Sequence, residues 1–372
     1  MKQTLLSGCL ALLLLLFTIT VHAKVWRVNN VSNYNGTTLY GENLGGTQTN
    51  PVFAQLNQAV TTNFVLAGDT IHLEGAVASY SNADINKRLV IIGPGYLLDE
   101  NPGSSNTLLE AKIGGIDFNT GSSGSELIGV SIVGSNLSID IGVGVSNITI
   151  KRCRIDYDIY VAYNNADIFI LQNYFANINN SQASAISISN LGFPSNFIFN
   201  NNIVKRPLLL FYSSTTYTAA EVKNNIFDCP AITGNPSIRL NTGSFQNNIL
   251  KNPAATANVN NNNSVNVSYN VSSSNSNQFG TANNNIVVTN INSIFVDPVT
   301  NSTDGDYQLL STWATANPGA DGAPRGAFGG ASPTRRYTLS GLAPIPVIYE
   351  INTSGVAGPG GLQVTIKAKV VQ

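Results

Sequence analysis

Short runs of alternating apolar and polar residues fill the middle of the chain. From Asn147 onward, each run has two apolar residues separated by polar ones, then a polar turn, an Asn, and another apolar residue two positions later. The clearest copies cover residues 148–155, 168–175 and 197–204. Because side chains of a strand point alternately to opposite faces, each run predicts short strands that bury one stripe.

The turn of this pattern recurs at nearly constant intervals. From Val130 through Cys153 to Asn270, the steps are 23, 20, 29, 23, 23 and 22 residues. A period of roughly 22 residues is typical of one solenoid turn with an occasional loop insertion. A single turn cannot bury a core, so successive turns must stack into parallel sheets. We therefore predict an all-β fold, a parallel β-helix.

Asparagine occupies most of the turns. An Asn tolerates left-handed backbone angles, and its amide can both donate to and accept from an identical amide one coil away. We predict a ladder of stacked amides, with Cys153 as a small buried substitute at one rung. The alternative is that Asn merely populates loops, which the regular spacing disfavours. The predicted ladder consists of Asn173, Asn202, Asn225, Asn248 and Asn270.

The first residues read as an export signal. Lys2 is followed by an apolar run over residues 10–21 and by the cleavage-type triplet Val21-His22-Ala23. We predict a signal peptide over residues 1–23, a β-helix domain with its N-terminal cap over 24–330, and a C-terminal β tail over 331–372. The mature chain has no further apolar run long enough to span a bilayer, so we expect a secreted or cell-surface protein.

The composition of the chain limits the classes of binding partner that we expect. Only 10% of the residues are charged and the formal net charge is −1, so no basic surface is expected for nucleic acid or an anionic membrane. Cys153 and Cys229 lie about three coils apart, or roughly 14 Å at the spacing of stacked strands, which is too far for a disulfide. We expect two buried free thiols and a monomer.

Three groups of segments resemble a known family. The chain is similar to the pectate-lyase-like superfamily of secreted right-handed parallel β-helix repeat proteins, of the Bacteroidetes type. The resemblance implies a right-handed solenoid with a short N-terminal capping helix, here at 53–60, and a closing segment before the tail. It implies no single activity, because such proteins include lyases, hydrolases and adhesins. The similar segments are 53–60, 68–73, 88–93, the turns between 130 and 271, 295–298, 305–309 and 326–330.

The tail contains two runs with strand character. Residues 345–349 and 362–366 are rich in Ile and Val, and a Gly-rich stretch separates them. They predict two strands of a tail that either caps the far end of the solenoid or forms a small attachment module.

In the families that the chain resembles, substrate lies along the outward residues of the sheet that precedes the repeat. The matching strands are expected at 137–141, 159–162, 185–190, 208–212 and 237–240. Their outward positions are Ser138, Asp140, Tyr160, Ser187, Leu209, Phe211 and Arg239. This set is poor in acids and bases. If the protein is a polysaccharide lyase or glycoside hydrolase, Asp140, Asp158 and Arg239 are the candidate catalytic residues.

A second charged group surrounds Asp156 and Asp158, next to Lys151, Arg152 and Arg154. It could bind a sugar acid or a phosphate, but we expect the solvated outer edge of one coil. The only histidine of the mature chain, His72, is expected to be structural. No resident cofactor or metal site is expected, and structural calcium near Asp297, Asp304, Asp306 or Asp321 stays an alternative.

The leading hypothesis is a non-catalytic protein that binds a polysaccharide or cell-surface glycan, or has an adhesive or structural role. Aromatic rings stack on sugar rings and amides hydrogen-bond to hydroxyls. The candidate ligand-binding residues are Tyr157, Tyr160, Tyr163 and Tyr212. The alternative for each tyrosine is packing at the corners between coils.

Overall fold

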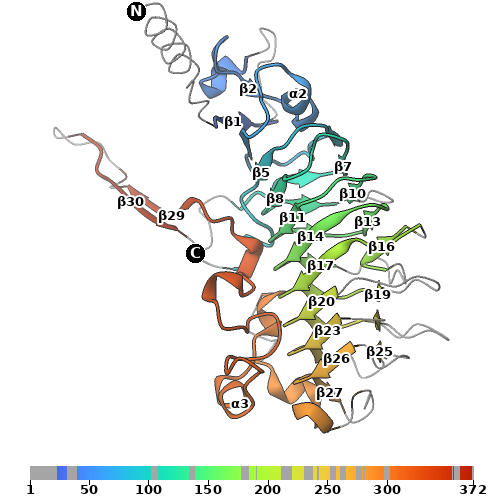
Figure 1. Cartoon of the computed structure of the whole chain (residues 1–372). Coiled ribbons are helices and arrows are strands. Elements are labelled where there is room, and N and C mark those ends of the chain that lie inside the picture. Colours follow the sequence, from blue (N-terminus) through green and yellow to red (C-terminus); the bar gives the residue numbers. More distant parts are fainter. Residues whose placement is uncertain are drawn as a thin grey trace, which may run out of the picture.

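The computed structural model shows a long stack of short strands with the first described residues at one end (Figure 1). It describes residues 23–31, 40–101, 108–133, 139–176, 184–189, 191–210, 220–229, 238–240, 243–251, 257–259, 265–273, 279, 281–296, 302–353, 355 and 361–370.

Most strands belong to two long parallel sheets. The first sheet has, in spatial order, β2 (Val52–Phe53), β1 (Val25–Val28), β3 (Thr70–Leu73), β5 (Val90–Ile92), β8 (Glu126–Ile128), β11 (Ile148–Lys151), β14 (Ala166–Leu171), β17 (Ser195–Asn200), β20 (Ala220–Lys223), β23 (Gly243–Gln246) and β26 (Val265–Ser268). The second sheet has β28 (Ile286–Val288), β27 (Val271–Ser273), β24 (Ile249–Leu250), β21 (Ile226–Phe227), β18 (Ile203–Val204), β15 (Tyr174–Phe175), β12 (Arg154–Ile155), β9 (Ser131–Ile132) and β6 (Lys112–Ile113).

A third face completes each coil. Its five-stranded part, called the third sheet below, contains β4 (Ala83–Ile85), β7 (Ile116–Phe118), β10 (Ile139–Ile141), β13 (Ile159–Val161) and β16 (Ile186–Ile188). Three further strands continue this face: β19 (Leu208–Leu210), β22 (Ile238–Leu240) and β25 (Ala257–Val259). The amide of Ala185 donates to the carbonyl of Pro207 at the step between the two parts. The described residues therefore form a parallel β-helix, as predicted, whereas its right hand stays a prediction.

Alternation along each strand creates the core. In β11, Ile148 and Ile150 are fully buried, whereas Thr149 and Lys151 point outward and are half-buried. Aromatic rings from successive coils extend the interior, and the Phe175 and Phe199 ring centroids lie 5.6 Å apart. Burial of each large apolar side chain contributes about 1.5–3 kcal/mol, so stacking coils stabilises a shape that one coil could not hold.

An amide ladder runs along the corner between the first and second sheets. At a typical rung, the Asn225 backbone N–H and Nδ2 donate to Oδ1 of Asn248, at 2.9 and 3.0 Å, and Nδ2 also donates to the carbonyl of Phe199 at 2.8 Å. The ladder contains all five predicted asparagines, Asn173, Asn202, Asn225, Asn248 and Asn270, and extends to Asn285. The Cys153 N–H donates to Oδ1 of Asn173, so this cysteine occupies the preceding rung.

The sharp bend falls one residue earlier than predicted. Left-handed φ angles belong to the residue before each rung, such as Gln172 (58°), Asn201 (57°) and Asn247 (58°), and not to the ladder Asn itself. Each corner thus uses two residues: the first makes the turn and points its side chain outward, and the second points its amide inward. The expectation that the ladder Asn adopts the left-handed angle was wrong.

The C-terminal part of the β-helix folds back over this corner. Residues 318–343, called the strap, run from the last coils toward the first ones (Figure 1). The outward corner side chains bind it: Asn247 accepts from the Ala320 N–H at 2.9 Å, and Asn201 donates to the Ala327 carbonyl at 2.8 Å. Farther along, Arg152 donates to the Leu342 carbonyl at 2.8 Å.

The strap also closes a second core outside the second sheet. Outward apolar side chains of that sheet, including Ile203, Ile226 and Ile249, are buried against strap residues such as Ala327 and Tyr337. The periodic pattern therefore has apolar residues on both faces of these short strands.

Both ends of the chain carry short elements. The capping helix α2 spans Leu56–Thr61, so the prediction of a helix from 53 was wrong at its start, where Phe53 belongs to β2. The two strands predicted for the tail are present as β29 (Pro346–Thr353) and β30 (Val364–Val370), and they pair antiparallel. The domain boundary at 330 stays a prediction. The described residues also form α3 (Ser311–Ala316) and the 3-10 turns η2 (Glu42–Leu44), η5 (Ala282–Asn284), η6 (Ile291–Ile294), η7 (Gly305–Tyr307), η8 (Pro333–Arg335) and η9 (Leu339–Gly341).

Cys153 and Cys229 are both free and buried, as predicted. Among the helices that the structure describes, none is long and apolar enough to cross a bilayer. The proposed signal peptide lies almost entirely outside the described residues.

Candidate functional site

The outer face of the third sheet carries a row of oxygen-bearing side chains. The strand register places Asp140 opposite Tyr160 on one side and opposite Asp117 on the other. Asp117 in turn lies opposite Asp84, and Tyr160 lies opposite Ser187. We call Asp84, Asp117, Asp140, Tyr160 and Ser187 the acidic row.

Local sequence explains why these side chains point outward. Each aspartate stands between two buried apolar residues, as Asp140 does between Ile139 and Ile141. The two flanking residues fill the core, so the middle one must face solvent. Residues in register on neighbouring parallel strands lie about 4.8 Å apart, so the three carboxylates form a compact acidic surface.

The middle carboxylate has the most perturbed environment. Burial raises the pKa of Asp117, and the neighbouring carboxyls of Asp140 and Asp84 raise it further. Both effects disfavour the charged form, since a carboxylate loses hydration and meets like charges. This group therefore holds a proton more readily than an isolated aspartate.

The sequence prediction found only part of this row. Asp140, Tyr160 and Ser187 were expected to point outward, whereas Asp84 and Asp117 were missed because they precede the regular repeats. A local signal was present: Ala83-Asp84-Ile85, Ile116-Asp117-Phe118 and Ile139-Asp140-Ile141 share an apolar-Asp-apolar pattern.

Two of the three candidate catalytic residues, Asp140 and Asp158, lie on neighbouring coils, whereas Arg239 is farther along the stack. Asp158 lies before β13, and its Oδ2 accepts a 2.6 Å hydrogen bond from the Ser187 hydroxyl. Arg239 belongs to β22, whose side chains lie outside the described residues. Counting β13, β16, β19 and β22, its backbone is four strands from Asp140, or roughly 19 Å at the usual strand spacing. The backbone therefore does not bring Asp140 and Arg239 together on neighbouring coils.

The tyrosine candidates differ in exposure. Tyr160 is 38% exposed and belongs to the acidic row. Tyr157 and Tyr163 are half-buried, and the guanidinium of Arg206 lies 5.4 Å from the centre of the Tyr157 ring. Tyr212 lies outside the described residues. Only Tyr160 is thus known to offer an open ring on the predicted face.

The charged group around Asp156 is not a solvated edge. Arg152 is 1% exposed and Asp156 is 3% exposed, and Arg154 pairs with Asp156 at 2.8 Å. The expectation of solvated charges was wrong for this part, because the strap covers Arg152 and the coil buries Asp156.

The described residues contain no set of three His, Cys, Asp or Glu side chains arranged to hold a metal. Asp304 is fully buried and accepts hydrogen bonds from Asn101 and Ser302, and Asp321 accepts from two backbone N–H groups. Asp297 lies outside the described residues, and structural calcium stays untested. His72 lies on β3, where burial lowers its pKa.

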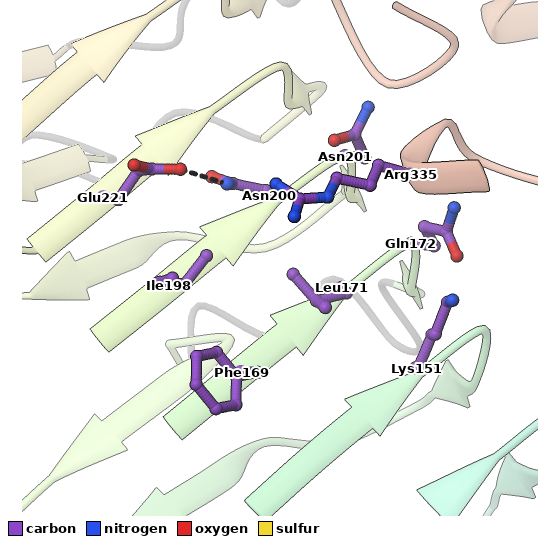
Figure 2. A pocket seen from close by; sticks show the side chains of 9 residues that line it. All are labelled: Lys151, Phe169, Leu171, Gln172, Ile198, Asn200, Asn201, Glu221 and Arg335. Atoms are coloured by element: carbon purple, nitrogen blue, oxygen red, sulfur yellow. Dashed lines mark hydrogen bonds between the residues drawn. The ribbon is translucent and has the colours of Figure 1, made fainter. Parts of the chain in front are cut away.

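A pocket opens on a different face, over the first sheet (Figure 2). Its cavity has a volume of about 200 Å³. Side chains of β11, β14, β17 and β20 form its floor, and the strap contributes one side. It is lined by Lys151, Phe169, Leu171, Gln172, Ile198, Asn200, Asn201, Glu221 and Arg335.

No protein-family model, curated protein or solved structure matches this chain significantly. Functional inference therefore rests on the residues of the chain and their arrangement.

Proposed function

We propose that this protein is an exported β-helix protein of the pectate-lyase-like type that binds a polysaccharide or cell-surface glycan without cleaving it. The acidic row is the observation that carries the proposal. It aligns three carboxylates, a phenol and a hydroxyl along one outer face, at the regular spacing of the strands.

The chemistry of the row suits an uncharged or basic sugar. Carboxylate oxygens accept hydrogen bonds from vicinal sugar hydroxyls, and charge-assisted bonds of this kind are stronger than neutral ones. The exposed ring of Tyr160 offers an apolar face for one sugar ring. Repetition along the sheet favours an extended chain over a single sugar.

A glycan-array screen of the mature protein, with and without calcium, tests this proposal. Reducing ends and the absorbance of unsaturated sugars are followed in parallel. Binding that Tyr160→Ala weakens, without any new ends, is the expected result. Lack of binding to any glycan would contradict the proposal, and so would turnover.

One observation favours glycoside hydrolysis as a second candidate. Asp117 and Asp140 lie on adjacent strands, and the raised pKa of Asp117 is a property of a general acid. A carboxyl separation of about 5 Å is typical of retaining glycosidases, and it is close to the strand spacing. New reducing ends that disappear in both Asp117→Asn and Asp140→Asn would establish this alternative.

A further inference from the structure

The pocket over the first sheet has an apolar floor where a solvent-facing surface would ordinarily be polar. Phe169 and Leu171 of β14 and Ile198 of β17 point outward and are only half-buried. Phe169 and Ile198 are partners in the strand register, so their side chains lie side by side. Figure 2 shows them grouped in the lower part of the pocket. Apolar groups gathered in a concavity favour an apolar ligand body.

Two cations border this floor. Lys151 projects from β11, and Arg335 reaches over the pocket from the strap (Figure 2). Among the described residues, neither the Lys151 ammonium nor the Arg335 guanidinium has a hydrogen-bonding or ion-pair partner. Burial lowers the pKa of Lys151, and Arg152 and Arg335 lower it further, whereas Glu126 opposes them. The two side chains therefore share a positive field that an anion would neutralise.

Glu221, the acidic residue that lines the pocket, already has hydrogen-bonding partners. One oxygen of Glu221 accepts from the Asn200 amide at 2.6 Å, and the other accepts from Lys223 at 2.9 Å. Lys223 neutralises Glu221 from outside the pocket, and Glu126 of β8 offsets part of the Lys151 charge without forming an ion pair with it, so the border of the pocket keeps a net positive charge. The floor of the pocket is therefore apolar, and its border is cationic.

We propose that this pocket binds a small organic carboxylate, with the carboxylate between Lys151 and Arg335 and a ring-sized body on Phe169. An Arg side chain recognises a carboxylate through paired N–H donors, and Lys adds a point charge. The volume of about 200 Å³ accommodates one ring. Inorganic phosphate and sulfate lack the body that the floor would cover. The site lies on a different sheet from the acidic row and does not depend on it.

Ligand-observed NMR titration of the mature protein tests the charge requirement. Phenylacetate is compared with its neutral isostere phenylacetamide, and glucuronate with glucose, so that aromatic and sugar carboxylates are distinguished. At least one carboxylate is expected to bind saturably, about tenfold more tightly than its neutral partner, and more weakly at high salt. Equal binding of acid and neutral partner, or no saturable binding by either acid, would overturn the proposal.

Substitutions in the pocket test whether the carboxylate binds there. The double variant with Lys151→Met and Arg335→Gln is expected to lose carboxylate binding, and Phe169→Ala is expected to weaken it severalfold. Lys151→Arg keeps the charge and should keep binding, which separates loss of the site from a folding defect. Lys112→Met on β6 of the second sheet is the matched control and should bind like the wild type. Undiminished affinity in the double variant would overturn the assignment. Asp117→Asn should leave this binding unchanged, whatever its effect on glycan binding.

Discussion

Two rows of identical side chains in the β-helix, one of asparagine and one of aspartate, have opposite physical consequences. At the corner, buried asparagines repeat from coil to coil, and each amide both donates and accepts. On the third sheet, Asp84, Asp117 and Asp140 repeat in the same way, but carboxylates can only accept hydrogen bonds and repel one another. Stacking therefore stabilises the fold at the asparagine row and weakens it slightly at the aspartate row.

This difference indicates which row serves the fold. A buried amide that lost its neighbour would leave unpaired donors, so the ladder is needed for stability. The acidic row contributes like-charge repulsion at a surface, which weakens the fold slightly. Residues that weaken a fold and remain grouped on one face are candidates for binding, which is why the proposed function rests on this row.

The largest expected effect comes from a substitution that breaks the asparagine ladder. Asn225→Ala removes the acceptor for the Asn202 N–H and Nδ2 and leaves the Phe199 carbonyl without its amide donor. Loss of these buried partners should reduce the free energy of unfolding by about 3 kcal/mol. Urea denaturation measures the change. The control Asn266→Ala, on the outer side of β26, should stay within about 0.5 kcal/mol of the wild type.

A smaller loss is expected at the rung where cysteine replaces asparagine. The Cys153 thiol contacts the Lys151 carbonyl at 3.2 Å and the Leu127 carbonyl at 3.6 Å, and thiol hydrogen bonds are weak. Cys153→Ala should therefore cost about 1 kcal/mol in the same denaturation experiment. A loss as large as that of Asn225→Ala would show that side-chain amide bonds are not what stabilises the corner.

Removing a charge from the acidic row should raise the stability of the fold instead of lowering it. Asp117→Asn removes repulsion from two neighbours and should raise the free energy of unfolding by about 0.5 kcal/mol near neutral pH, since solvent screens much of it. Asp84→Asn is the matched control: β4 is the edge strand of the third sheet, so Asp84 has one carboxylate neighbour and should gain less. A loss of stability in Asp117→Asn would contradict the repulsion.

The same repulsion predicts a small pH dependence. Because the folded-state pKa of Asp117 is raised, the folded protein binds a proton more readily than the unfolded chain. Protonation of Asp117 therefore stabilises the folded protein. This contribution is fully present at pH values below the pKa of Asp117 in the unfolded chain, and it is lost as the pH rises through the pKa of Asp117 in the folded protein. The stability gap between wild type and Asp117→Asn should therefore shrink on acidification from neutral pH. Thermal unfolding at several pH values measures it, and a widening gap would contradict the assignment.

Regular parts of the fold could be predicted from the sequence because they repeat. The Asn spacing located the ladder, and the alternation located the strands that carry Asp140, Tyr160 and Ser187. Asn285 was missed because its step from Asn270 is only 15 residues. The strap was not predicted, since its burial depends on outward residues of coils far away in the sequence.

The candidate site was harder to predict for the same reason. Asp84 and Asp140 become neighbours of Asp117 only through strand register, because their coils differ in length. The pocket needs Arg335 of the strap beside side chains of four strands, a combination that no local pattern contains. Rows built by equal steps can be predicted from sequence, whereas contacts made by a returning segment cannot.

Glycan affinity and stability, measured together in Asp117→Asn, show whether the acidic row serves binding at a cost to the fold. A glycan selected by the array is titrated against wild type, Asp117→Asn and Asn266→Ala, and each protein is unfolded in urea. Asp117→Asn should be slightly more stable than the wild type and bind the glycan about tenfold more weakly, while Asn266→Ala should bind normally. Undiminished binding by Asp117→Asn would contradict the claim that the acidic row is the glycan site.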